Sequence, residues 1–385
     1  MTAEKLLFSM LRSVVCGWEV DEQVKNAATP ELLEETFNLA NKHDLGHLVG
    51  QAVANWKLPE CPVGAKAKQV AMDAFCRYMR IDYEYQRLCR ILEEAKTPFI
   101  PLKGSVLRSS YPEPWMRTSC DIDILVKKEQ LEETSKLLQE KANYRYILIT
   151  PHDVSLRAPS GVHLELHYDT IEDAICHEAQ EILGKVWETA RPVRPDAFQM
   201  AMPDEMFYYY HVAHMAKHFQ NGGCGVRPFL DLWIMEHRME HDPEMRAALI
   251  KQGGMLAFWE ASVKLVNAWF SGEKPDEMSQ RFARFTLNGG TYGSMEGQVM
   301  IRQNQSGSKL KYIFCRIFLA YDVIKFEYPI LMKHKWLTPF YQVRRWFKLF
   351  RKDSRRRTAQ QLQATGDINR RIQAETTALM NYLGL

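Results

Sequence analysis

The string Asp121-Ile122-Asp123-Ile124-Leu125-Val126 decides how the middle of this 385-residue chain folds. Neighbouring residues of a β-strand point to opposite faces of the sheet, so Ile122 and Ile124 mark the buried side of a predicted strand. Asp121 and Asp123 then project together from the other side. Two like charges on a core strand are costly unless something compensates them. Because carboxylate oxygens suit Mg²⁺ or Mn²⁺, the string predicts a strand that carries a metal site.

A third carboxylate comes from the string Val162-His163-Leu164-Glu165-Leu166-His167. Its alternation places His163, Glu165 and His167 on one face of a second predicted strand and the two leucines on the other. A two-metal site for phosphoryl transfer usually needs a carboxylate from another strand. We therefore predict that Glu165 either accepts a proton from an acceptor hydroxyl or binds a second metal ion.

The segment Lys103-Gly104-Ser105 lies between an apolar run at 99–102 and the acidic strand. Gly104 permits a close approach of the backbone to a ligand, and Ser105 opens a predicted helical segment whose N–H groups can bind phosphate. Lys103 adds positive charge. An Asp-x-Asp pair alone is common and often only caps a turn. Its combination with this segment and with Glu165 favours a catalytic site.

The remaining patterns predict an α+β protein with a small mixed sheet between two helical regions. Residues 1–97 have helical spacing, with one helix starting at Thr29-Pro30 and a longer one over 65–95. Residues 98–190 are expected to form a core of four or five strands, and residues 191–385 are helical again. Strands are expected at 144–150, 154–158 and 162–168, and later helices at 206–219, 229–238, 244–250 and 255–270.

These motifs together resemble the DNA polymerase β-like nucleotidyltransferase superfamily. More narrowly, the chain resembles the bacterial uncharacterised nucleotidyltransferase family (the NTP-transferase 5 group), and the resemblance covers most of its length. The motifs that carry it are Pro101-Leu102-Lys103-Gly104, Arg117 through Val126, Glu165-Leu166-His167-Tyr168, and the helical strings at 214–219 and 225–233. Lys103 departs from the superfamily, where a small residue usually precedes this glycine.

The resemblance implies transfer of a nucleoside monophosphate from an NTP to a hydroxyl group. Asp121, Asp123 and Glu165 would be catalytic and would hold Mg²⁺ or Mn²⁺, while Gly104 and Ser105 would hold the β- and γ-phosphates. The acceptor stays open among a small molecule, an envelope precursor, a protein and RNA. One alternative is a catalytically quiet nucleotide-binding or toxin–antitoxin-type partner protein on the same fold. Another is a membrane-peripheral envelope enzyme.

Several residues outside the strands are further candidates. Arg117, Lys217 and Arg227 are predicted to contact nucleotide, although Lys217 can equally be a surface residue and Arg227 can equally pair with Asp231. The histidines 211, 214 and 218 share one helix face, which suggests Zn²⁺ binding less than a polar stripe along the cleft. The glycine-rich segment 222–225 lacks the strand and the ending of a P-loop, so a tight turn is favoured.

The charge is concentrated in one place. The net charge of +3 gives no overall reason to expect nucleic-acid binding, and no strong nucleic-acid signal exists. The segment 344–357, however, carries eight basic residues and one acid, which leaves −4 for the rest of the chain. Aromatic residues are interleaved with it and precede it. The basic-aromatic segment 336–357 is therefore a candidate for an anionic membrane surface, with a solvated basic helix as the commoner alternative.

The sequence predicts a cytoplasmic protein, with membrane-peripheral attachment as the alternative. Its apolar runs are shorter than the roughly 18 residues that a membrane span needs, and Glu4, Lys5 and Arg12 interrupt the apolar start. The eight cysteines are scattered without a Cys-x-x-Cys motif, which is typical of reduced thiols.

Overall fold

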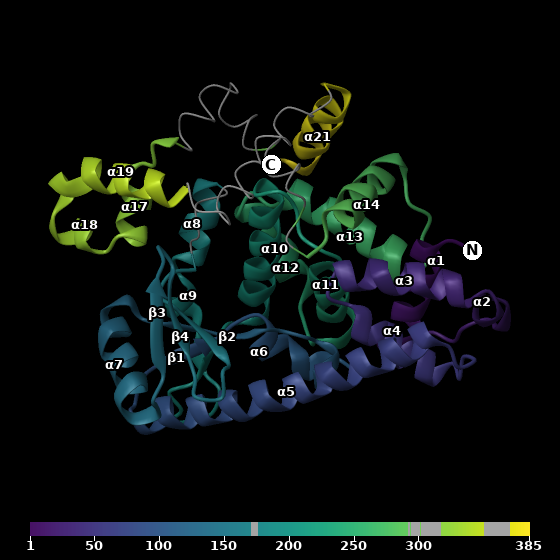
Figure 1. Cartoon of the computed structure of the whole chain (residues 1–385), viewed down its shortest axis with the longest axis horizontal. Helices are drawn as coiled ribbons and strands as arrows, with labels where there is room; N and C mark the ends of the chain where they lie inside the picture. The colour runs from purple at the N-terminus through teal and green to yellow at the C-terminus, as the bar shows by residue number, and fades with distance from the viewer. Residues whose placement is uncertain (171–175, 292, 294–300, 302–316, 350–369) are drawn as a thin grey trace.

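The computed structural model of the chain describes residues 1–170, 176–291, 293, 301, 317–349 and 370–385, and Figure 1 shows how they are arranged. The N-terminal part is a series of helices, followed by the strands. These elements are α1 (Ala3–Leu11), η1 (Arg12–Cys16), α2 (Glu22–Asn26), α3 (Pro30–Lys42), α4 (Gly46–Asn55) and α5 (Pro62–Glu94). Thr29 caps α3 by accepting the N–H of Leu32, so the predicted helix start is confirmed.

The middle of the chain forms a five-stranded mixed sheet in the order β1-β2-β5-β4-β3, in which β2 and β5 are parallel. The predicted α+β class and the three predicted later strands are confirmed. The strands are β1 (Phe99–Pro101), β2 (Asp121–Val126), β3 (Arg145–Ile149), β4 (Asp153–Arg157) and β5 (His163–His167). The helices between them are α6 (Gly104–Leu107), η2 (Arg108–Ser110), η3 (Pro114–Met116), η4 (Lys128–Gln130) and α7 (Leu131–Ala142).

The remaining described elements are mostly helical, as expected. They are α8 (His177–Leu183), α9 (Val186–Thr189), β6 (Arg191–Pro192), β7 (Met200–Ala201), α10 (Asp204–Gln220), α11 (Arg227–Arg238), α12 (Pro243–Gln252), α13 (Leu256–Phe270), α14 (Glu277–Gly289), α17 (Tyr321–Glu327), α18 (Ile330–Lys333), η5 (Lys335–Leu337), α19 (Thr338–Leu349) and α21 (Arg370–Leu383). Among the described residues, no helix combines the length and the apolar character that crossing a bilayer requires.

One face of the sheet is covered by α5 and α7. Ile122, Ile124 and Val126 are fully buried in a core that also contains Leu88 of α5 and Leu138 of α7. This confirms the buried side that the alternation in the acidic strand predicts. The opposite face, which carries the acidic side chains, is turned toward the helices of the C-terminal half.

Helix α5 joins the sheet to the helical part of the molecule, and Figure 1 shows it running beneath both. Its first half contributes Ala67 to a large helical core, whereas Ile81, Leu88 and Leu92 of its second half belong to the core under the sheet. A single 33-residue helix therefore fixes the position of the sheet relative to the helices.

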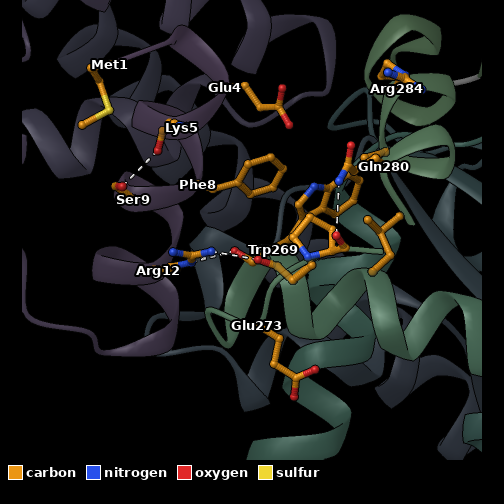
Figure 2. A pocket seen from close by; sticks show the side chains of 14 residues that line it. Met1, Glu4, Lys5, Phe8, Ser9, Arg12, Trp269, Glu273, Gln280 and Arg284 are labelled. Carbon is orange, nitrogen blue, oxygen red and sulfur yellow. Dashed lines mark hydrogen bonds between the residues drawn. The ribbon is translucent and has the colours of Figure 1, made fainter. Parts of the chain in front are cut away.

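The large helical core combines the two ends of the chain. Phe8 of α1 stacks on Trp269 of α13 with ring centroids 4.8 Å apart, and both rings belong to the same buried cluster as Phe229 of α11. Figure 2 shows the hollow where α1 meets α13 and α14, beside this stack. The predicted helical regions 1–97 and 191–385 thus share one core, and a division of the chain at 97 and 190 stays a prediction.

The basic-aromatic segment begins in a small separate unit. Helices α17, α18 and α19 pack on one another around Ile324, Tyr328 and Leu331, which form their own buried cluster. The part of the predicted segment from 350 to 357 lies outside the described residues.

Candidate active site

The acidic residues are brought together by the parallel pairing of β2 and β5. Asp121 lies opposite His163 in the register, and Asp123 lies opposite Glu165. Because paired residues of neighbouring strands point to the same face, these four side chains share the sheet face away from α5. His167 follows on the same face at the end of β5. The alternation in the two sequence strings therefore predicts the shared face correctly.

Asp123 is the centre of the hydrogen bonding in this cluster. Its Oδ1 accepts one hydrogen bond from Lys103 Nζ and one from His167 Nε2, each at 2.9 Å. Glu165 lies beside them, with one oxygen 3.4 Å from His167 Nε2 and the other 4.0 Å from His163 Nδ1. Buried Asp123 is thus compensated by two cationic partners, whereas Glu165 remains partly open to solvent.

Burial and charge shift the pKa values within the cluster in opposite directions. Burial, followed by the charges of Asp123 and Glu165, raises the pKa of Asp121 to about 6. Burial alone would also raise the pKa of Asp123, but Lys103 and His167 hold it well below its usual range. At His167 burial would lower the pKa, but the hydrogen bonds to Asp123 and Glu165 outweigh it and raise the pKa of the imidazole. The site is therefore polarised, with one carboxylate fixed in its charged form and one that gains a proton easily.

The side chains form two overlapping groups that could hold a metal ion. Asp121, His163 and Glu165 make one group, and Asp123, Glu165 and His167 make the other, with ligand atoms within 4.8 Å of one another in each. Glu165 belongs to both, so two cations bound there would share it. Carboxylate oxygens suit Mg²⁺, and the imidazoles widen the donor set toward Mn²⁺ and other transition metals. The donor chemistry fits a divalent cation.

Lys103 reaches Asp123 from an unusual backbone conformation. Its φ of 47° and ψ of −119° are those of the first central residue of a type II′ turn, a position that normally requires glycine. The turn is closed by a hydrogen bond from the N–H of Ser105 to the carbonyl of Leu102. Strain of this kind persists where the surroundings enforce it, and it clusters at functional sites.

Gly104 leaves room for the cations around the turn. A Cβ atom at this position would lie 3.3 Å from Arg117 Nη1 and 3.6 Å from Arg108 Nη2. A larger residue would push these guanidinium groups away. The absence of a side chain at Gly104 thus lets the chain pack closely against them.

The acidic cluster opens into a cavity of about 600 Å³ whose lining residues run from Asn41 to Thr291. The strands and the turn supply its floor, and both helical regions supply its sides. The lining residues are Asn41, Asp44, Lys103, Gly104, Arg117, Ser119, Cys120, Asp121, Asp123, Glu165, His214, His218, Arg227 and Thr291. Of the predicted site residues, Ser105 and Lys217 do not line it.

The two predicted arginines differ in their partners. Arg117 Nε donates to the carboxylate of Asp231 at 2.7 Å and 3.0 Å. Arg227 Nη1 donates instead to Asp44 at 3.0 Å. The expected alternative pairing of Arg227 with Asp231 is therefore wrong, because the start of α11 turns Arg227 toward the N-terminal helices. In the described structure, buried Nε of Arg227 has no hydrogen-bond partner.

The other predicted groups of α10 do not form a metal site in the described structure. His211 is hydrogen-bonded to the carbonyl of Pro228, while His214 and His218 contact each other through their Nε2 atoms at 3.0 Å. Burial, with help from Lys217, lowers the pKa of His218 to about 4. Burial and the charge of Lys103 lower the pKa of Lys217 to about 8, which places Lys217 near the site although outside the cavity lining. The predicted polar stripe faces the cavity through His214 and His218.

The glycine-rich segment between α10 and α11 is a tight turn, as expected. Gly222 and Gly223 both have positive φ, which glycine adopts without steric cost. A Cβ at Gly225 would lie 3.0 Å from Thr291 and 3.1 Å from His43. The glycines therefore serve close packing between helices.

Sequence reasoning assigned no role to several residues of the site, among them His167, Asn41 and Asp44. His167 was overlooked although the alternation in its strand places it beside Glu165. Asn41 and Asp44 lie at the end of α3, about 80 residues before the acidic strand, and line the same cavity. No local pattern relates these two residues to Asp121, because their proximity depends on how α3 packs above the sheet.

Comparison with known protein families assigns the chain to one of them. The model of a family described as uncharacterised nucleotidyltransferase matches residues 30–271, which is more than half of the chain. The matched range includes the cavity residues from Asn41 to Arg227. The chain matches no curated protein and no solved structure.

Proposed function

We propose that this chain, which belongs to the family of uncharacterised nucleotidyltransferases, transfers a nucleoside monophosphate from an NTP to a hydroxyl group of an acceptor. The observation that carries the proposal is the cluster of Asp121, Asp123 and Glu165 on one sheet face, at the floor of a cavity. A placement in the DNA polymerase β-like superfamily is part of this proposal.

The proposed cofactor is Mg²⁺ or Mn²⁺, held by Asp121, Asp123 and Glu165 with His163 and His167 beside them. When bound, a divalent cation would supply charge neutralisation for the triphosphate and its leaving group. Asp123 is already fixed in its charged form by Lys103 and His167, so it would need no proton loss before binding.

In the proposed reaction, the oxygen of the acceptor hydroxyl forms a bond to the α-phosphorus of the NTP. The bond between the α-phosphorus and the oxygen that bridges to the β-phosphate breaks, and pyrophosphate leaves. Glu165, whose carboxylate is 27% exposed toward the cavity, accepts the hydroxyl proton. Lys103 and Arg227 supply positive charge for the phosphates from two sides of the cavity.

The acceptor is proposed to be chosen by the helical walls of the cavity. Asn41 and Asp44 of the N-terminal helices and His214 and His218 of α10 offer hydrogen-bonding groups opposite the sheet. These groups suit a polar acceptor, for which a small molecule, an envelope precursor, a protein or RNA remain the candidates.

A second candidate function is nucleotide binding without turnover. The observation that favours it is that Asp123 Oδ1 is shared by Lys103 and His167, which compete with a cation for the same oxygen. Under this hypothesis the chain would act through a protein partner, as in a toxin–antitoxin pair. The two functions differ in whether pyrophosphate is released.

The decisive experiment measures pyrophosphate release and NTP binding with each of the four common NTPs, in Mg²⁺ and in Mn²⁺. We expect metal-dependent binding, and release of pyrophosphate once a suitable acceptor is supplied. Asp121→Asn and Asp123→Asn should abolish the metal dependence, whereas Glu132→Gln on the exposed surface of α7 should leave it unchanged. Binding that ignores metal and both aspartate variants would contradict the proposal, and binding that never yields pyrophosphate would favour the second candidate.

A further inference from the structure

Helices α17, α18 and α19 form a small unit that uses only one side of α19 for its own packing. Leu337 and Tyr341 pack on the cluster of Ile324, Tyr328 and Leu331. In Figure 1 this unit lies at the upper left, away from α11, α13 and α14. The inner face of α19 therefore accounts for the folding of the unit and leaves the outer face available.

The outer face of η5 and α19 is an aromatic stripe made of Trp336, Phe340, Val343 and Phe347. The steps of four, three and four residues place these side chains in one line along a helix. Trp336, Phe340 and Phe347 are 70%, 67% and 70% exposed. Ile330 and Met332 of α18, which packs on η5, are also exposed. A contiguous exposed patch of this kind marks an interaction site.

Positive charge predominates around the aromatic stripe, although Glu327 of α17 lies 3.6 Å from Arg345 of α19. Between Ile330 and Leu349 the sequence contains five basic residues and no acidic residue. Arg344 lies over the rings of Tyr328 and Tyr341, 5.9 Å and 5.5 Å from their centroids, which holds a charge close to the stripe. A partner that fits this face must accept apolar side chains and carry negative charge.

A second exposed stripe elsewhere in the molecule shows that apolar exposure alone does not identify the partner. Met72, Phe75, Met79 and Tyr83 form a similar line on α5. Its charged neighbours in the sequence, Asp73, Arg77, Arg80 and Asp82, have both signs. The run of basic residues without an acid at 330–349 distinguishes the stripe on α19.

We propose that the aromatic stripe of η5 and α19 lies on an anionic membrane surface. Tryptophan and phenylalanine side chains enter the boundary between headgroups and acyl chains, and nearby lysines and arginines attract anionic lipid. Single-stranded nucleic acid is the weaker fit, because Val343, Ile330 and Met332 are aliphatic side chains that offer no ring for stacking bases. The inference does not depend on the proposed transfer reaction.

The test is flotation of the full-length protein with vesicles. One set contains phosphatidylcholine alone, and the other contains about 30% phosphatidylserine in phosphatidylcholine. We expect flotation only with the anionic vesicles. Replacing Trp336, Phe340 and Phe347 by serine should lower the apparent partition coefficient about tenfold or more, because three exposed apolar anchors are lost. Lys333→Gln should lower it by up to about fivefold, since one surface charge is removed.

The matched control carries Met72→Ser, Met79→Ser and Tyr83→Ser, which removes the same number of exposed apolar side chains from α5. This control should float like the unaltered protein, and circular dichroism should report the same helix content for all variants. Failure of the unaltered protein to float would overturn the proposal, as would equal losses in the two triple variants. A stripe variant that loses binding to a single-stranded RNA, or loses self-association, without any vesicle binding in the parent would assign the face to that partner instead.

Discussion

Two buried carboxylates, Asp123 in the sheet and Asp231 in α11, are each paired with a cation but face different surroundings. Asp231 is bound by Arg117 and by the hydroxyl of Tyr111, and the side chains of Asp231 and Arg117 are 1% and 9% exposed. Asp123 is bound by Lys103 and His167, and the Lys103 side chain remains 22% exposed at the cavity. Both Arg117 and Lys103 line the cavity, but the pair of Arg117 with Asp231 is almost fully buried, while the pair of Lys103 with Asp123 is more accessible.

This difference separates a structural contact from a site that can exchange its partner. Arg117 is held by Asp231 and by the carbonyl of Thr118, so moving it toward a ligand would leave a buried charge behind. Lys103 can leave Asp123 through the cavity without becoming buried alone. Arg117 therefore serves best to position the turn around Gly104, and Lys103 is the better candidate for contact with phosphate.

The largest expected effect comes from replacing each of the two carboxylates by an amide. Asp231→Asn should lower the free energy of unfolding by about 3–5 kcal/mol, because it strands the buried charge of Arg117. Asp123→Asn should lower it by no more than about 1–2 kcal/mol, since Lys103 reaches solvent and His167 can release its proton. Urea unfolding of both variants measures these values.

In assays of metal-dependent NTP binding or turnover, Asp123→Asn should be the more damaging of the two variants. Asp123→Asn should lower NTP affinity or turnover at least about 100-fold. Asp231→Asn should keep the affinity and turnover of the unaltered protein for each folded molecule. If Asp123→Asn is the more destabilised variant, or if Asp231→Asn alone loses NTP affinity while folded, the distinction between the two carboxylates is wrong.

The sequence contains enough information to predict each face of β2 and β5, but not the pairing between them. The alternation of Ile122 and Ile124 with the aspartates is local, and the structure confirms it. The register that places Asp123 beside Glu165 joins residues 42 positions apart and is set by packing on α5. The periodicity of a local segment contains no information about contacts between segments that are far apart in the sequence.

The partners of Arg117 and Arg227 could not be predicted for the same reason. Arg117 and Asp231 are separated by 114 positions, and Arg227 and Asp44 by 183. Both arginines stand near predicted motifs, so the sequence marks them as relevant to the site. That Arg117 and not Arg227 pairs with Asp231 depends on the orientation of α11 against α3, which only the three-dimensional core determines.

The next largest effect concerns the strained turn at Lys103, which distinguishes the more accessible pair from the almost fully buried one. Lys103→Gly and Lys103→Ala both remove the ammonium group, but only glycine adopts the positive φ without cost. We expect Lys103→Gly to be more stable than Lys103→Ala by about 1–2 kcal/mol in urea unfolding.

Both variants should weaken NTP binding to the same extent, because each lacks the charge. Lys96→Gly and Lys96→Ala provide a control at another lysine with positive φ, 54°, located outside the cavity lining. There the stability difference should recur without any change in NTP binding. Equal stabilities of the two Lys103 variants would show that the turn is not strained.

The smallest effect separates two buried histidines. At His167, burial and the charge of Lys103 act to lower the pKa, but the hydrogen bonds to Asp123 and Glu165 raise it. At His43, burial lowers the pKa to about 4 despite a hydrogen bond to the carbonyl of Leu287. An unfolded histidine titrates near pH 6.5, so between about pH 6.5 and 4 the unfolded state binds the proton that folded His43 refuses.

Stability associated with His43 is therefore complete above about pH 6.5 and is lost as the pH falls toward 4. We expect His43→Gln, which keeps a donor for Leu287, to reduce the loss of unfolding free energy between about pH 7 and pH 5.5 by about 1 kcal/mol. Burial also lowers the pKa values of His47 and His218 to about 4, so these two residues should account for part of the pH dependence that remains in the unfolding free energy. The control His177→Gln changes an exposed side chain of α8. If the pH dependence of the unfolding free energy is unchanged in His43→Gln, His43 accepts its proton within the folded protein. The buried surroundings of His43 would then tolerate charge as the cavity does.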